Sequence, residues 1–157
     1  MSTQVLQLPP EESMSPDELA RAAAQAMYEA DGCTRALGME LLEVRAGYAR
    51  LRMAVRPEFL NGHQTCHGGM IFSLADSAFA FACNSHNQRA VAQHCAITYL
   101  APGRLGDVLT ARCREISRAE RSGIYDVTVT RQDGEVIAEF RGLSRTVKGT
   151  LVLETGV

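Results

Sequence analysis

MIFSLADSAFAFAC, residues 70–83, indicates the architecture of this chain more clearly than any other segment. It is apolar on every side apart from two serines and one carboxylate, Asp76. The segment is longer than an ordinary strand and alanine dominates it, so it predicts a helix. A helix that is apolar all round is a buried helix. We therefore expect the rest of the chain to pack around residues 70–83.

The sequence after residue 89 predicts strands, because apolar and polar residues alternate along it. The alternation is clearest in 91–99, 109–114, 125–130 and 136–140. Asp133-Gly134 predicts a hairpin turn between the last two strands. One face of the first strand should carry Val91, Gln93, Cys95, Ile97 and Tyr99.

The last strand contains a change of phase. Val136, Ala138 and Phe140 share a face, whereas Leu143 falls in the opposite phase. A bulge inserts one residue and shifts the alternation by one position. We therefore expect a bulge near Gly142.

A helix also precedes the strands. Ser15 can cap it, Pro16 suits its first position and Glu18 completes a capping box. Apolar residues then recur at three- and four-residue spacing, which predicts one apolar stripe. Asp31-Gly32 ends this helix.

Two strands over 39–44 and 48–55 form a predicted hairpin, and a polar, glycine-rich loop over 56–68 leads to the central helix. The predicted fold is therefore α+β: an antiparallel sheet of five to six strands wrapped around a central apolar helix, with an extra amino-terminal helix. Any side of the central helix left bare in one chain would need a partner subunit.

Length and composition suit one globular domain without nucleic-acid or membrane partners. The 157 residues are 46% hydrophobic and 22% charged, and the net charge of −2 gives no basic footprint for nucleic acid. No apolar run reaches the length of about 18 residues that crosses a bilayer. We expect a single domain over 15–149, a flexible tail over 1–14 and a second tail over 150–157.

The five cysteines, at 33, 66, 83, 95 and 113, are scattered and odd in number, which does not suit a disulfide framework. The amino terminus has no basic region followed by an apolar one, as a secretory signal would. Reduced thiols without such a signal predict a cytoplasmic protein.

NGHQTCHGG, residues 61–69, ends in two glycines just before the central helix. Glycines at a helix start let another molecule approach the free amides closely. The helix dipole adds partial positive charge there, so the amides of Gly68 and Gly69 suit a developing oxyanion. The alternative is a glycine-rich helix start that binds nothing.

Asp76 is the second candidate for chemistry. A carboxylate in an apolar helix is costly unless it is paired or used, and burial raises its pKa. The alternative is a structural acid that is hydrogen-bonded to a loop. Gly69 and Asp76 lie roughly 10 Å apart along one helix, which is too far for one site. We therefore hypothesise that two chains related by a twofold axis each contribute one part.

His63, Cys66 and His67 have the spacing of metal ligands but do not complete a site. Adjacent residues rarely serve one ion and no second cluster supplies further ligands, so we expect no metal. Only His67 could activate Cys66, which argues against a nucleophilic thiol. His94 lies in a predicted strand and is expected to be a packed or surface side chain.

At these residues the sequence resembles the small phenylacetate-pathway thioesterases, hotdog proteins that hydrolyse phenylacetyl-CoA and its ring-hydroxylated relatives. Asn-Gly-His, then His-Gly-Gly, then an acid within Ala-Asp is fairly specific for this family, whereas His-Gly-Gly alone is shared with other hotdog proteins. The resemblance leaves out only the two ends of the chain. The matching segments are AMYEADGCTRALG (26–38), FLNGHQTCHGGMIFSLADSAFAFACNS (59–85), ITYLAPG (97–103), GDVLTA (106–111), SGIYDV (122–127) and FRGLS (140–144).

The resemblance implies a role for each residue of the motif. The Gly68 amide would bind the thioester carbonyl, and Asp76 would act as general base on water or attack directly. Asn61 would orient the water or the acid, and His67 would shape the loop. The resemblance also implies hydrolysis of aryl-acetyl-CoA without a cofactor, at sites between the subunits of a homodimer that pairs into a homotetramer.

Arg104, Arg141 and Arg145 are candidates for binding the CoA phosphates, and an ordinary surface role is the alternative for each. The chain departs from the family in its longer amino-terminal tail. It also has Gln93-His94 in a strand where small residues usually lie near the acyl group.

Two other functions fit parts of the sequence. A hotdog enoyl-CoA hydratase or dehydratase would pair a catalytic histidine with an acid, and His67 is the candidate. A non-catalytic acyl-CoA sensor should carry an additional DNA- or partner-binding module, for which 157 residues leave no room.

Overall fold

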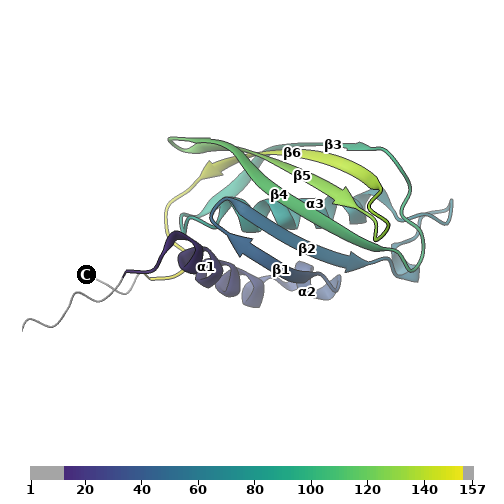
Figure 1. Ribbon diagram of the computed structural model, residues 1–157, viewed down its shortest axis with the longest axis horizontal. Helices are drawn as coiled ribbons and strands as arrows, with labels where there is room; N and C mark the ends of the chain where they lie inside the picture. The colour runs from purple at the N-terminus through teal and green to yellow at the C-terminus, as the bar shows by residue number, and fades with distance from the viewer. Residues whose placement is uncertain (1–12, 154–157) are drawn as a thin grey trace, which may run out of the picture.

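The computed structural model describes residues 13–153 (Figure 1). Most of the tail expected over 1–14, and residues 154–157 of the expected carboxyl-terminal tail, lie outside the described residues. In chain order the elements are α1 (Pro16–Ala30), α2 (Gly32–Ala36), β1 (Glu40–Arg45), β2 (Tyr48–Ala54), the 3-10 helix η1 (Pro57–Phe59), α3 (Gly68–Cys83), β3 (Ala90–Tyr99), β4 (Val108–Ala119), β5 (Ser122–Thr130) and β6 (Val136–Thr146).

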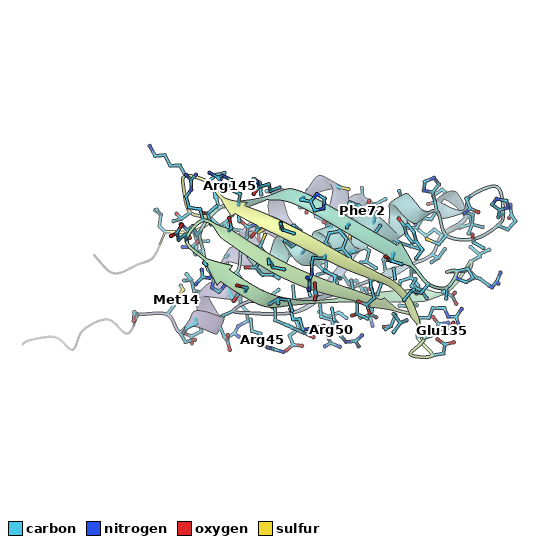
Figure 2. All side chains as sticks on the ribbon, turned by 90° about the horizontal axis from the view of Figure 1, so that it is seen from above. Met14, Arg45, Arg50, Phe72, Glu135 and Arg145 are labelled. Atoms are coloured by element: carbon cyan, nitrogen blue, oxygen red, sulfur yellow. The ribbon has the colours of Figure 1, made fainter. Side chains whose placement is uncertain are left out.

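The six strands form one antiparallel sheet, as expected, and their order in the sheet is β1-β2-β4-β5-β6-β3. The sheet packs against α3, and α1 and α2 lie beside β1 at the edge of the molecule (Figure 1). In Figure 2, seen from above, the strands lie in front of the helices, so the face of the sheet that points away from α3 is turned toward the reader. This is the α+β hotdog architecture, with α1 as the expected extra helix.

The two sides of α3 are buried to different degrees. Leu74, Ala75 and Ala78 are fully buried against the sheet. The opposite side, which includes Asp76 and Ser77, is only partly buried. The prediction of a buried central helix is confirmed, although one side remains open in a single chain. None of the helices among residues 13–153 has the length and apolar character to span a membrane.

The bulge predicted near Gly142 is wrong. β6 keeps its register at this residue. The extra residues lie at Gln93 in β3 and at Ile137 in β6, so the prediction that Val136 shares a face with Ala138 and Phe140 is also wrong. Gly142 faces α3, where an added Cβ would lie 2.8 Å from the Phe79 ring. A glycine stands there because the ring occupies the space, and Leu143 simply points to the outer face of the sheet.

The bulge at Gln93 also changes the faces of β3. Cys95, Ile97 and Tyr99 lie opposite inward-facing residues of β6, whereas Val91 lies on the outer face and is 51% exposed. The predicted common face of Val91 and Cys95 is therefore wrong, because one extra residue reverses the alternation.

The amino-terminal helix begins as predicted and is followed directly by a second helix that was not predicted. Ser15 and Glu18 form both hydrogen bonds of the capping box. Asp31 ends α1 and its side chain caps α2. α2 has only five residues, too few for a periodic pattern to reveal it.

The chain beyond residue 149 packs on the domain. The buried Asn87, in the turn after α3, accepts hydrogen bonds from the amides of Leu151 and Val152 at 3.0 and 2.9 Å. Its side-chain nitrogen donates to the Val152 carbonyl at 2.9 Å. The domain boundary expected at 149 thus falls inside a segment that this turn holds in place.

Candidate active site

The start of α3 is capped by a histidine. His67 has an extended backbone (φ −57°, ψ 133°), and its Nδ1 accepts a hydrogen bond from the Gly69 amide at 2.9 Å. An acceptor nitrogen carries no proton, so this side of the ring serves the cap. The His67 amide donates to the Phe59 carbonyl at 2.7 Å and ties the loop to the helix.

Tyr99 fixes the first peptide of α3 from the opposite side. Its hydroxyl donates to the Gly68 carbonyl at 2.8 Å. An added Cβ on Gly68 would lie 3.0 Å from the Tyr99 ring, and one on Gly69 would lie 3.0 Å from His67 Nδ1. A side chain at either position would therefore crowd a neighbouring side chain of the same chain.

These contacts leave one backbone donor free. The Gly69 amide is occupied by His67, whereas the Gly68 amide has no hydrogen-bond partner among residues 13–153. Gly68 opens a helix of 16 residues, so the helix dipole adds positive charge at this N–H. Of the two amides expected to hold an oxyanion, Gly68 is the one available.

Asn61 shapes the loop before the helix. Its side-chain oxygen accepts hydrogen bonds from the amides of His63 and Thr65 at 2.9 and 3.2 Å. Its side-chain nitrogen donates to the Thr65 hydroxyl at 3.0 Å. A pocket of about 420 Å³ opens beside this loop, with Asn61, Gly68 and Tyr99 in its wall. Asn61 and Gly68 thus line the same pocket.

Asp76 lies on the open side of α3 and is partly buried. Burial raises the pKa of its carboxyl, and the negative charge of Asp31 raises it further. No hydrogen bond or cation within the described chain lowers it. A structural acid held by a loop would have such partners. Asp76 therefore has the character of an acid kept available for another molecule.

One chain does not bring Asp76 to the pocket beside Gly68. The two residues lie eight positions apart on α3, which corresponds to about 12 Å along the axis. Asp76 is also absent from the wall of that pocket. The separation expected from the sequence is therefore present in the structure.

Cys66 has no features of a nucleophile. It is buried, and burial together with the charge of Asp107 raises its pKa to about 11. The thiolate is the reactive form, so this thiol is inert near neutral pH. Among residues 13–153, no three His, Cys, Asp or Glu side chains are grouped to hold a metal.

The three candidate arginines do not converge. Arg104 is exposed in the loop after β3. Arg141 makes a double hydrogen bond to Asp126, at 2.7 and 2.9 Å, so its charge already has a partner. Arg145 is exposed near the end of β6, at the opposite end of the sheet from Glu135 (Figure 2).

Sequence reasoning missed two contacts of this site. Tyr99 was expected only as one residue of a strand face, and nothing in the pattern indicated its bond to Gly68. The contact between Thr34 on α2 and Ser77 on α3 was also not anticipated, because α2 itself was not predicted.

The sequence matches proteins of known type. Residues 63–138 match the Thioesterase superfamily. The acyl-coenzyme A thioesterase PaaI of Escherichia coli (strain K12) is 46% identical over 131 residues, which cover 83% of this chain and 94% of that protein.

Solved structures agree. The Escherichia coli PaaI protein from the phenylacetic acid degradation operon has a TM-score of 0.85 at 45% identity, covering 87% of this chain and 99% of that one. A mutant of the phenylacetic acid degradation protein PaaI from Thermus thermophilus has a TM-score of 0.72 at 36% identity, covering 74% and 100%. A Streptococcus mutans UA159 protein bound to acetyl CoA has a TM-score of 0.70 at 26% identity, covering 72% and 91%. Identity to PaaI over most of both chains, with the shared sheet and buried helix, shows that this chain belongs to the PaaI-like acyl-coenzyme A thioesterases, hotdog proteins of the Thioesterase superfamily.

Proposed function

We propose that this chain hydrolyses aryl-acetyl-CoA thioesters, phenylacetyl-CoA or its ring-hydroxylated relatives, to the free acid and CoA. The observation that carries the proposal is the 46% identity to the acyl-coenzyme A thioesterase PaaI. The origin of that protein in a phenylacetic acid degradation operon supports the aryl-acetyl group. The acetyl CoA bound by the Streptococcus mutans relative supports a CoA thioester as the ligand.

The free amide and the available acid supply the chemistry. The Gly68 N–H donates to the thioester carbonyl oxygen, and the α3 dipole stabilises the negative charge that develops there. Ionised Asp76 takes a proton from water, whose oxygen attacks the carbonyl carbon. The C–S bond then breaks, and Asp76 returns the proton to the departing CoA thiolate. Direct attack by Asp76 would form an anhydride that water hydrolyses to the same products.

Two copies of the chain complete each site in this proposal. The open side of α3 and the exposed edge strand β3, where Tyr99 is 48% exposed, offer surface to a second copy. If the two α3 helices run antiparallel across a twofold axis, Gly68 of one chain meets Asp76 of the partner subunit, twice per dimer. Two such dimers would form a homotetramer.

Other residues have supporting roles in this proposal. Asn61 uses one amide hydrogen within its loop, so the second is available to orient water or the acid. His67 keeps the Gly69 amide occupied and so directs the carbonyl to Gly68. Arg104 and Arg145 are free to contact the CoA phosphates, whereas Arg141 would first have to leave Asp126. None of these steps uses a cofactor.

We also propose a cytoplasmic location and a single catalytic domain. All five cysteines are free, which supports a reducing compartment. The sheet and α3 share one core, and Asn87 binds the segment at Leu151 and Val152 by hydrogen bonds, which supports a domain that extends from the α1 cap to at least Val152.

A substrate panel tests the proposal. Thiol release from phenylacetyl-, hydroxyphenylacetyl-, benzoyl- and straight-chain acyl-CoA would be measured, beside hydration of an enoyl-CoA. We expect the highest kcat/KM for the two aryl-acetyl substrates, and loss of turnover with retained CoA binding in Asp76→Ala. Hydration in place of hydrolysis would favour a hydratase, in which His67 has to act through Nε2. CoA binding without any turnover would favour a sensor.

A further inference from the structure

The junction of α1 and α2 carries a second carboxylate, Asp31, which is linked through Thr34 to the segment of α3 that contains Asp76. Asp31 Oδ1 accepts the Thr34 amide at 2.9 Å, and Oδ2 accepts the Thr34 hydroxyl at 2.6 Å. Thr34 is fully buried, and its hydroxyl oxygen lies 3.1 Å from Ser77 Oγ on α3. Asp31 is therefore fixed against the segment of α3 that carries Asp76.

The hydrogen bonds between these groups have one direction. An ionised carboxylate only accepts, so Thr34 gives its single hydroxyl proton to Asp31. Thr34 must then accept from Ser77, which directs its own proton to Thr34. Asp76 consequently receives no hydrogen bond from the hydroxyl next to it in sequence. A hydrogen bond to the ionised form would have lowered its proton affinity.

The other titratable groups facing α3 stay neutral. Cys83 on α3 and Cys95 on β3 both have raised pKa values, about 12 for Cys83, first because they are buried and then because of Asp76. Cys113 on β4 and Tyr125 on β5 also have pKa values raised by burial. The buried positions of β1, β2 and β6 carry apolar or small side chains.

Two cations lie near Asp31. Arg35 Nε donates to the backbone carbonyl of Asp31 at 3.3 Å, away from the carboxylate. Arg89 shares the wall of a pocket of about 350 Å³ with Asp31, and its Nε donates to the Thr150 carbonyl at 3.0 Å. Within residues 13–153, no ion pair joins either arginine to Asp31 or Asp76. Asp31 is thus the charge that acts on Asp76 in the described part of the chain.

We infer that Asp31 is a positioning residue of the thioesterase site, which acts on Asp76 through its negative charge while Thr34 and Ser77 hold the two acids in place. The inference rests on the proposed function. Repulsion between the two carboxylates opposes ionisation of Asp76, so Asp76 holds a proton more tightly. A base with higher proton affinity removes a proton from water more readily. The direction agrees with the raised pKa of Asp76, to which burial contributes most and Asp31 next.

Asp31 also caps α2, and the test must separate the cap from the charge. Asparagine and serine cap helices about as well as aspartate, but neither is charged. Asp31→Asn and Asp31→Ser therefore remove the charge by two routes that keep the cap. Asp17→Asn is the matched control, because Asp17 lies at the other end of α1, binds the Ala46 amide at 3.0 Å and does not contribute to the raised pKa of Asp76.

The measurement is the pH dependence of kcat/KM for phenylacetyl-CoA, with KM and the melting temperature followed in parallel. We expect the acid limb to move to lower pH in both Asp31 variants, with plateau kcat lower by roughly two- to tenfold and KM unchanged. Asp17→Asn should keep the limb of the wild type. If one Asp31 variant fails to fold, the other carries the test.

The inference is overturned if the acid limb of the pH profile stays at the wild-type pH in folded Asp31 variants, whether or not the plateau kcat falls. A purely structural role of Asp31 would lower the rate without moving this limb. The proposed function fails separately. If Asp76→Asn keeps full hydrolysis, Asp76 is not the reacting acid, whatever the Asp31 variants show.

Discussion

Asp76 and Glu115 are both partly buried acids, but the fold treats them differently. Glu115 on β4 accepts a hydrogen bond from the Tyr125 hydroxyl at 2.7 Å, lies 2.8 Å from His86 Nε2 and has Arg118 at 3.8 Å. Asp76 on α3 has no such partner within the described chain. The Glu115 cluster joins the turn after α3 to β4 and β5, whereas Asp76 joins nothing.

The pKa values of the two acids follow this difference. Burial raises the pKa of Glu115, but the hydrogen bonds from Tyr125 and His86 offset it, so the pKa lies below its ordinary value. Burial and then Asp31 raise the pKa of Asp76. Burial raises the pKa of both acids, so their hydrogen-bond and charge partners decide whether the pKa ends above or below its ordinary value. An acid whose oxygens have partners, such as Glu115, stabilises the fold, whereas an acid without partners, such as Asp76, is available for chemistry.

The largest expected effect is the loss of activity in Asp76→Asn. Removing a general base should lower kcat by about 10²- to 10⁴-fold. The melting temperature should not fall, because the substitution removes a charge that burial disfavours. Steady-state thiol release and thermal unfolding check both parts. A variant that loses stability and keeps its rate would reverse the assignment of the two acids.

The next effect concerns the amide that faces the acid in the proposed site. Gly68→Pro removes the N–H, and proline is tolerated at the first position of a helix. The extended His67 backbone also suits a residue before proline. We expect kcat to fall by about 10²- to 10³-fold relative to Gly68→Ala, which keeps the N–H. Both variants place a Cβ against Tyr99, so that contact cancels in the ratio.

Glu115→Ala should show the opposite pattern from Asp76→Asn. Tyr125 is buried, and its hydroxyl would lose its acceptor. We expect the free energy of unfolding to fall by about 1–3 kcal/mol, with kcat close to the wild-type value. Chemical denaturation measures the first and thiol release the second. Glu58→Ala, at an exposed ion pair with Arg56, is the control and should change stability by less than about 0.5 kcal/mol.

The smallest effect is the pH dependence of stability. The pKa of Glu115 is lowered on folding, so its contribution is present above the unfolded value of about 4.3 and is lost as pH falls through the folded value. The pKa of Asp76 is raised on folding, so its ionisation lowers the free energy of unfolding as pH rises above about 3.9, and this loss is complete above the pKa of the folded state. Between neutral and acid pH, the stability difference from wild type should shrink for both Glu115→Gln and Asp76→Asn, but with opposite signs. Equal signs would contradict the comparison.

The parts of the fold that local patterns determine could be predicted. The apolar run over 70–83 and the capping box at Ser15 predict α3 and the start of α1, because side-chain period and cap chemistry act within a few residues. The bulge at Gln93 could not be predicted in this way. It lies in the pairing of β3 with β6, two strands far apart in the sequence.

The candidate site divides in the same way. Gly68 and Asp76 stand out in the sequence, one by its position at a helix start and the other as the charge in an apolar run. Tyr99 could not be assigned, because its partner Gly68 lies far away in sequence. Asp31 could not be assigned, because it acts at the start of α2, a helix too short to recognise from the sequence. The pairing of Arg141 with Asp126 likewise depends on strand register.

Mixed dimers offer the decisive measurement on a site shared between two chains. Chains carrying Asp76→Ala and chains carrying Gly68→Pro would be coexpressed with different tags, and the mixed pairs purified by both tags. Each parent should be nearly inactive. The mixed dimer has one site with both parts intact, so we predict about half of the wild-type rate per pair of chains. A mixed dimer as inactive as its parents would show that Gly68 and Asp76 do not act across two chains.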